Sequence, residues 1–143
     1  MAKVECPIED IECEFFHNWL KQFDIPHTHI PNESRSSKID AVIRAKKLQK
    51  MGVSSGYWDY DVYIPVLDLD GEVGGYELIK IEMKRAEKRL STVSANQKKW
   101  GKIYEMSGIT KFICYGAEEA ENRVMEMYEL INQKKLMRKP IDF

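Results

Sequence analysis

Acidic and basic side chains alternate along one predicted strand in a pattern that suits metal and phosphate chemistry. Within the stretch Ile-Lys-Ile-Glu-Met-Lys-Arg, Glu82 and Lys84 are two residues apart. They therefore share one strand face with Lys80, while Ile81 and Met83 turn toward the core. The carboxylate can bind a hard divalent cation, and the neighbouring ammonium can stabilise charge that develops on a phosphate. Taken alone, this triplet is better explained by an ion pair on an exposed strand.

The preceding strand supplies further carboxylates. Asp59 and Asp61 are again two residues apart and share a face. If the two strands pair in antiparallel fashion, the hairpin brings an aspartate beside Glu82. Such oxygen ligands suit Mg²⁺ or Mn²⁺, with positions left open for water and a phosphate oxygen. Aspartate is uncommon in strands, and the competing explanation is that these charges protect an edge strand from pairing.

The elements that must position these residues follow from hydrophobic spacing and turn residues. Helices are predicted over 9–23, 36–50, 94–106 and 116–135, and strands over 27–30, 59–67, 76–84 and 110–115. The order α-β-α-β-β-α-β-α predicts a mixed sheet flanked by helices, of the α/β or α+β class. The apolar residues of the second and last helices are expected to face inward: Ile39, Val42, Ile43, Leu48, Met51, Ala120, Val124, Met127, Tyr128 and Ile131.

Composition limits the classes of function. The 143 residues suit a single domain over 1–143, and with no apolar run of about 20 residues and no apolar leader, we expect a cytoplasmic protein without membrane contact. Three cysteines, an odd number with no close pair, disfavour a disulfide framework. The net charge is −1, but cations concentrate between residues 84 and 102. A DNA backbone is the expected partner of this surface, through Arg85, Lys88, Arg89, Lys98, Lys99 and Lys102.

Several short motifs, in order along the chain, resemble the virus-type replication-repair nuclease (VRR-NUC) domain of the PD-(D/E)xK nuclease superfamily. The resemblance spans about Thr28 to Ile131. The motifs are His29-Ile-Pro-Asn-Glu33, Gly52-Val-Ser-Ser-Gly56, Asp59, Ile81-Glu-Met-Lys84, Ser94-Ala-Asn-Gln97 and Gly116-Ala-Glu-Glu-Ala120.

This resemblance implies a restriction-endonuclease-like fold and a set of site residues. The family's metal-binding aspartate corresponds to Asp59, and its acid and lysine to Glu82 and Lys84. Its upstream glutamate and its glutamine correspond to Glu33 and Gln97. Together they imply an Mg²⁺ or Mn²⁺ ion held by Asp59, Glu82 and the backbone carbonyl of Met83, with Glu33 completing the shell.

Two positions keep alternative readings open. The family usually has proline before its aspartate, whereas Trp58 stands here, and the residues after Asp61 also fit the family pattern. Asp59 is preferred for its spacing from Gly56, with Asp61 as the alternative ligand. The Ser94-x-x-Gln97 spacing is also a helix capping box, which is compatible with a role of the glutamine at the site.

The function that the resemblance implies is metal-dependent DNA endonuclease activity, selective for branched DNA such as the Holliday junction. Small stand-alone relatives imply a homodimer in a bacterial or phage-infected cell. Phe15, Phe16 and Trp19 of the first helix could form the dimer face or the core. One alternative function is a catalytically inactive DNA-binding or assembly module on the same fold. A second is a structural protein whose hairpin charges only protect an edge.

Overall fold

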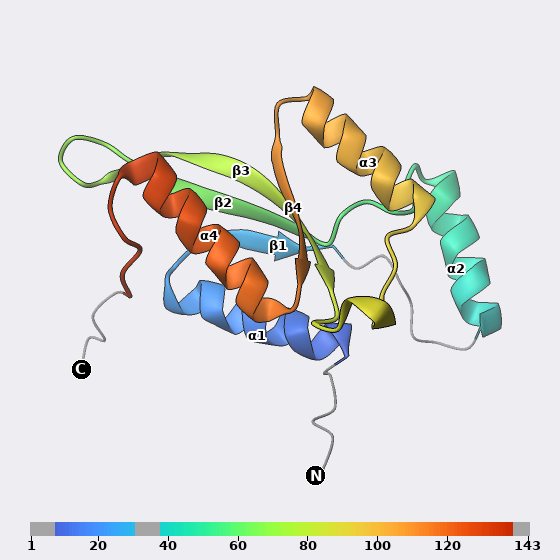
Figure 1. The fold of residues 1–143 in the computed structure, drawn as a ribbon. Helices are drawn as coiled ribbons and strands as arrows, with labels where there is room; N and C mark the ends of the chain where they lie inside the picture. The colour runs from blue at the N-terminus through green and yellow to red at the C-terminus, as the bar shows by residue number, and fades with distance from the viewer. Residues whose placement is uncertain (1–7, 31–37, 139–143) are drawn as a thin grey trace, which may run out of the picture.

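The computed structural model, which describes residues 8–30 and 38–138, has the expected order of elements (Figure 1). The elements are α1 (Glu9–Gln22), β1 (His27–His29), α2 (Lys38–Lys50), β2 (Tyr60–Leu67), β3 (Val73–Lys84), the 3₁₀ turn η1 (Lys88–Leu90), α3 (Ala95–Met106), β4 (Thr110–Tyr115) and α4 (Ala117–Asn132). The predicted ends shift by only a few residues. The fold is α+β, as the sequence indicates.

The four strands form one mixed sheet in the order β1-β2-β3-β4. β2 pairs antiparallel with both β1 and β3, and β4 joins β3 in parallel. Because Tyr60 lies opposite Ile81 in this register, the residue before Tyr60 comes beside Glu82. β2 and β3 are inner strands, so their charges do not protect an edge, and the edge-protection explanation is wrong.

The core lies between one face of the sheet and the helices α1 and α4. Ile81 and Met83 are fully buried in it, as their alternation with Glu82 predicts. The inward face predicted for α4 is confirmed, with Ala120, Val124, Met127 and Tyr128 buried and Ile131 partly buried against the same core. This packing holds β2 and β3 in register and brings the N-terminus of α1 toward the end of the sheet that carries Glu82.

Helix α1 divides its aromatic residues between core and solvent. Phe16 is fully buried and Trp19 packs partly against the core, whereas the side chain of Phe15 is 55% exposed. Phe16 thus belongs to the core, and Phe15 remains on the surface. Among the described residues, no helix combines the length and apolar composition that crossing a bilayer requires.

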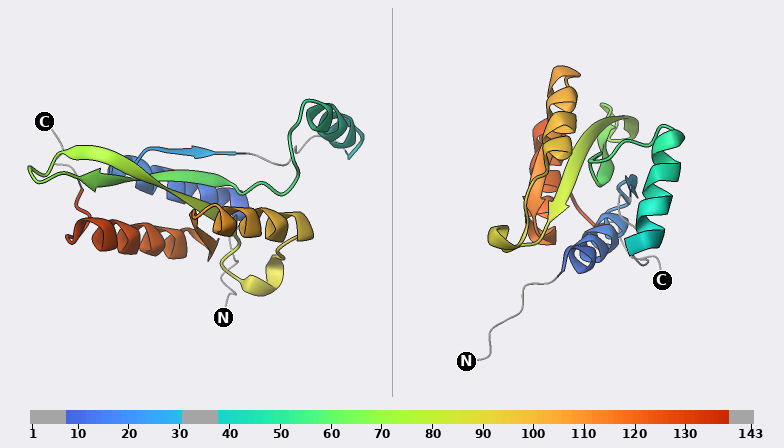
Figure 2. Two further views of the ribbon diagram at one scale, coloured as in Figure 1. Left: turned by 90° about the horizontal axis from the view of Figure 1, so that it is seen from above. Right: turned by 90° about the vertical axis from the view of Figure 1, so that its right-hand side faces the viewer.

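The inward face predicted for α2 is wrong. The exposed fractions of Val42, Ile43, Leu48 and Met51 range from 39% to 72%, and the side chain of Ile39 lies outside the described part of the chain. Figure 2 shows α2 standing beyond the end of the sheet rather than on its core face. The physical reason is that α1 and α4 already cover that face, and the apolar residues of α2 are interleaved with lysines rather than gathered in one stripe.

Candidate active site

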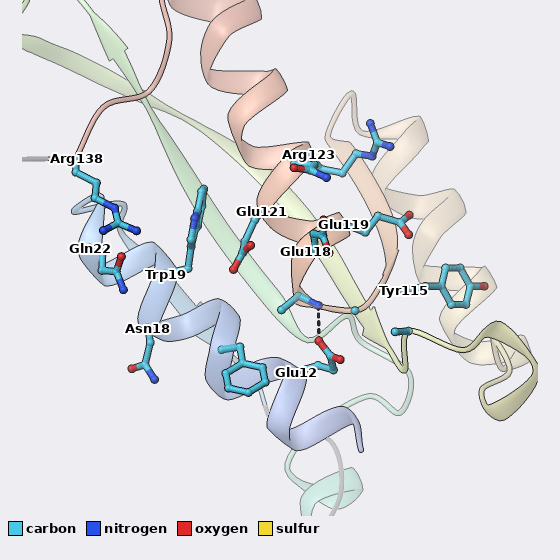
Figure 3. A pocket seen from close by; sticks show the side chains of 15 residues that line it. Glu12, Asn18, Trp19, Gln22, Tyr115, Glu118, Glu119, Glu121, Arg123 and Arg138 are labelled. Carbon is cyan, nitrogen blue, oxygen red and sulfur yellow. Dashed lines mark hydrogen bonds between the residues drawn. The ribbon is translucent and has the colours of Figure 1, made fainter. Parts of the chain in front are cut away.

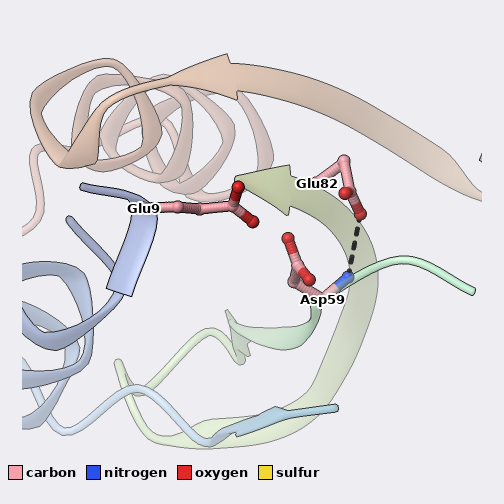
Figure 4. Close-up of side chains that lie close together, drawn as sticks. All are labelled: Glu9, Asp59 and Glu82. Atoms are coloured by element: carbon pink, nitrogen blue, oxygen red, sulfur yellow. Dashed lines mark hydrogen bonds between the residues drawn. The ribbon is translucent and has the colours of Figure 1, made fainter. Parts of the chain in front are cut away.

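Three carboxylates from distant parts of the chain converge at one end of the sheet. Glu9 lies in the first turn of α1, Asp59 directly precedes β2, and Glu82 lies in β3. Each side chain has a carboxylate oxygen within 4.8 Å of an oxygen of the other two (Figure 4). The side chains of Asp59 and Glu82 are 8% and 1% exposed. A cluster of carboxylate oxygens is the donor set that Mg²⁺ and Mn²⁺ prefer.

Backbone amides hold two of these carboxylates in place. The amide of Asp59 donates to Glu82 Oε2 at 3.1 Å, and the amide of Met83 donates to Asp59 Oδ2 at 2.9 Å. The amide of Asp59 thus orients the carboxylate of Glu82, and the amide of Met83, next to Glu82, orients the carboxylate of Asp59. The two acids are fixed by the same pairing of β2 and β3 that forms the core.

Gln97 joins Glu82 to Lys84. Its amide Nε2 donates to Glu82 Oε1 at 2.6 Å, and its Oε1 accepts from Lys84 Nζ at 3.0 Å. The ammonium itself lies 3.4 Å from Glu82 Oε1. Gln97 also completes the capping box of α3, since its Oε1 accepts from the Ser94 amide and its own amide donates to Ser94 Oγ. Gln97 therefore both caps α3 and contacts two of the predicted site residues, and its role in the chemistry stays a prediction.

The electrostatics of the cluster favour added positive charge. Burial and, to a lesser extent, the neighbouring Asp59 carboxylate raise the pKa of Glu82, and Lys84 lowers it, with a net rise to about 8. The Lys84 ammonium alone thus does not offset the desolvation of Glu82 and its repulsion by Asp59. A divalent cation would do so, and the residues present fit such an ion.

Asp61, the alternative metal ligand, has a different partner. Its carboxylate pairs with Lys80 Nζ, which also donates to the hydroxyl of Tyr57. Lys80 is 2% exposed, and its ammonium lies 4.1 Å from the centroid of the Tyr57 ring and 5.1 Å from that of Tyr104. Asp59 is the aspartate that joins the acidic cluster, and Asp61 neutralises a buried lysine.

Glu9 is a candidate ligand that sequence reasoning missed. Its position in an acidic first turn, with Asp10 and Glu12, is sufficiently explained by the helix dipole, and no spacing connects it to Asp59 fifty residues later. Glu33, the upstream acid that the resemblance implies, lies outside the described residues. The carbonyl of Met83 stays a predicted ligand.

The predicted DNA-binding residues lie on α3 and around η1. Lys98, Lys99 and Lys102 are exposed on α3. Lys88 is exposed with its ammonium 4.9 Å from the centroid of the Tyr115 ring, and Arg89 is exposed beside Glu87. Arg85, which directly follows β3, is half-buried.

The hollow between α1 and α4 has a net negative lining, with four glutamates against Arg123 and Arg138 (Figure 3). Glu118, Glu119 and Glu121 line it together with Glu12, whose carboxylate accepts from the amide of Ala117 at 2.6 Å and so caps α4. Burial and the neighbouring acids raise the pKa of Glu121. Phosphates would be repelled from this hollow and attracted to the side that α3 forms.

Comparison with known proteins identifies the fold. No protein-family model matches the chain, and no curated protein matches its sequence. A solved structure described as a VRR_NUC domain protein superimposes with a TM-score of 0.62 at 20% sequence identity, covering 90% of this chain and 93% of that one. The mixed four-stranded sheet with its flanking helices is therefore the fold of a VRR_NUC domain protein, as the motifs along the sequence indicate.

Proposed function

We propose that this protein is a nuclease that hydrolyses phosphodiester bonds of DNA with the help of a divalent cation. The observation that carries the proposal is the convergence of the Glu9, Asp59 and Glu82 carboxylates next to the Lys84 ammonium. Carboxylates around a cation with a lysine beside them suit phosphoryl chemistry better than they suit a structural site. The likeness to the fold of a VRR_NUC domain protein agrees with this chemistry.

The acidic cluster would hold Mg²⁺ or Mn²⁺. Asp59 and Glu82 are the proposed ligands, with Glu9 as a third, and the Met83 carbonyl and Glu33 are further ligands that the resemblance implies. When bound, the cation polarises the phosphate and makes a coordinated water more acidic. The amide hydrogen bonds to Asp59 and Glu82 keep their oxygens aimed at one point before the cation arrives.

Lys84 stabilises negative charge that develops on the phosphate. Its side chain is 7% exposed, so the interaction of its ammonium with nearby charge is weakly screened. Gln97 positions it by accepting a hydrogen bond from the ammonium through Oε1, while its Nε2 donates to Glu82. Lys84 is thus held at a fixed distance from the carboxylates instead of collapsing fully onto them.

The exposed cations would bind the DNA backbone without reading sequence. We place the phosphates over Lys98, Lys99 and Lys102 of α3, with Lys88, Arg89 and Arg85 of the η1 region at the other side of the site. Branched DNA such as a Holliday junction is the proposed substrate. A homodimer would present two sites to such a nearly symmetric junction, with the exposed Phe15 available for subunit contact.

The direct test uses supercoiled plasmid and a synthetic four-way junction, each incubated with Mn²⁺ or with EDTA. We expect cutting with Mn²⁺ only, and loss of cutting in Glu82→Ala and Lys84→Ala. Glu9→Gln should reduce cutting at limiting Mn²⁺. Junction binding without cutting, unchanged by metal, would instead indicate an inactive DNA-binding module. Light scattering of the wild-type protein tests the dimer.

A further inference from the structure

A cluster of aromatic rings lies directly beside the acidic site, under α3. Trp100 stands 4.9 Å from Tyr57 and 6.0 Å from Tyr104, and Trp58 stands 5.4 Å from Tyr104, measured between ring centroids. Trp58 and Tyr104 are only 2% and 3% exposed. Tyr57 and Trp100 are half-buried, so they are the members of the cluster that solvent reaches. Their rings meet edge to face at 77°, and the Lys80 ammonium covers one face of the Tyr57 ring.

The buried members of the cluster are sufficient to fix α3 on the sheet. The indole Nε1 of Trp58 donates to the carbonyl of Gln97 at 2.8 Å, and the Trp58 amide donates to the Tyr104 hydroxyl at 3.2 Å. Gly101 leaves room for the same indole, since an added Cβ would lie 2.9 Å from Trp58 Cζ2. Anchoring therefore explains Trp58 and Tyr104, but it does not require the open ring surface of Tyr57 and Trp100.

The half-buried rings of Tyr57 and Trp100 lie close to residues of the acidic site. Tyr57 precedes Asp59 by two residues, and its hydroxyl accepts from Lys80, which shares a strand face with Glu82. Trp100 follows Gln97 by one turn of α3, and Gln97 contacts both Glu82 and Lys84. Through these contacts the rings lie next to the acidic cluster.

The lysines around the rings indicate the chemical class of the ligand. Lys98, Lys99 and Lys102 are exposed on the turns of α3 that carry Trp100. Ammonium groups interleaved with an accessible aromatic ring are the combination that binds single-stranded nucleic acid, with phosphates on the cations and bases stacked on the ring. A base inside a duplex cannot offer its face in this way.

We propose that Trp100, with the Tyr57 ring packed edge-on against it, forms a stacking platform for an unpaired nucleobase adjacent to the phosphate at the acidic site. This inference rests on the proposed function in one respect: that the phosphate at the acidic site is the one that is cut. It restricts the substrate to DNA with an unpaired nucleotide next to the cut, as found where the strands of branched DNA separate.

The test measures binding in EDTA, by fluorescence anisotropy, to a labelled oligothymidylate and to an abasic oligonucleotide of the same length. The two probes carry equal phosphate charge, but only the first has bases. Wild-type protein should bind the oligothymidylate about 5- to 100-fold more tightly. Trp100→Leu should lose that preference, Trp100→Phe should keep most of it, and Lys99→Ala should weaken binding to both probes equally.

Equal binding of the two probes by the wild-type protein would overturn the stacking platform, and this comparison needs no variant to fold. A preference that persists in Trp100→Leu and in Tyr57→Leu, with thermal melts that show both variants folded, would overturn the assignment to these rings. Because no metal and no cutting are involved, a failed cleavage assay leaves this result unaffected. The nuclease proposal and the stacking platform can therefore fail separately.

Discussion

Glu82 is the most deeply buried of the three clustered carboxylates, and its proton links the stability of the fold to the metal site. Its native pKa of about 8 lies above the ordinary value of 4.5, chiefly because the carboxylate is desolvated. Between these pH values the native state binds more protons than the unfolded chain. The contribution of this group to stability is therefore complete below about pH 4.5 and is lost as the pH rises through 8.

For the metal-free protein, we expect the free energy of unfolding to fall between pH 5.5 and 8. The contribution of Glu82 is at most about 1.4 kcal/mol per pH unit. Urea denaturation in EDTA at several pH values measures it. Glu82→Gln removes the titrating proton and should flatten the dependence, and Mn²⁺ at pH 8 should stabilise the wild type more than the variant. Parallel pH profiles for the two proteins would show that Glu82 is not the responsible group.

The two aspartates of the hairpin should have separable roles. Asp59→Asn should weaken Mn²⁺ binding about tenfold or more, since even the outer partners of metal ligands have effects of that size. Asp61→Asn should leave Mn²⁺ affinity nearly unchanged but lower the free energy of unfolding by about 3–5 kcal/mol, because Lys80 then lies buried without its counter-charge. Calorimetric titration and urea denaturation measure the two effects. A large loss of Mn²⁺ affinity in Asp61→Asn would reverse the assignment.

At the scale of the elements, the loop before β2 must approach the start of α3 closely for the site to assemble. Gly56 has a φ of +80°, and a Cβ there would lie 2.5 Å from Asn96 Cβ and 2.8 Å from the Gln97 nitrogen. Any side chain would push α3 outward. The glutamine that holds Lys84 and Glu82 would move with it.

Gly56→Ala should therefore lower the free energy of unfolding by about 2–4 kcal/mol, from backbone strain and overpacking together. Gly52→Ala is the matched control, because Gly52 also has a positive φ, +94°, but its Cβ would meet nothing within 4 Å. Gly52→Ala should lower the free energy of unfolding by the backbone strain alone, about 1 kcal/mol. Urea denaturation compares the two variants. Equal losses would mean that close approach to α3 contributes nothing.

The sequence predicts the strands better than the placement of the helices. Alternation in β2 and β3 fixes which face is buried, and the hairpin places Asp59 beside Glu82 from local pairing alone. Helix α2 shows the limit, because apolar residues in a helical segment do not reveal whether any sheet face remains for them to cover. Glu9 shows the same limit at the site, since only tertiary packing brings α1 to β2 and β3.

At the scale of the whole molecule, charge divides the surface although the net charge is only −1. The hollow between α1 and α4 gathers four glutamates against two arginines, whereas the lysines of α3 lie on another side. Such a division orients a polyanion before any close contact forms. DNA should therefore approach over α3, toward the end of the sheet that carries the acidic cluster.

This orientation predicts which lysines control the salt dependence of DNA binding. Each phosphate contact contributes about 0.7–0.9 to the slope of log affinity against log salt concentration. Replacing both Lys99 and Lys102 with alanine should lower that slope by about 1 to 2, measured by anisotropy with a labelled junction in EDTA from 50 to 300 mM salt. Lys134→Ala is the control, because this exposed lysine lies after α4, near Gly71 in the turn between β2 and β3. The Lys134→Ala variant should leave the slope unchanged. If it lowered the slope as much as the loss of one α3 lysine does, DNA would be attracted by overall charge and not by the surface of α3.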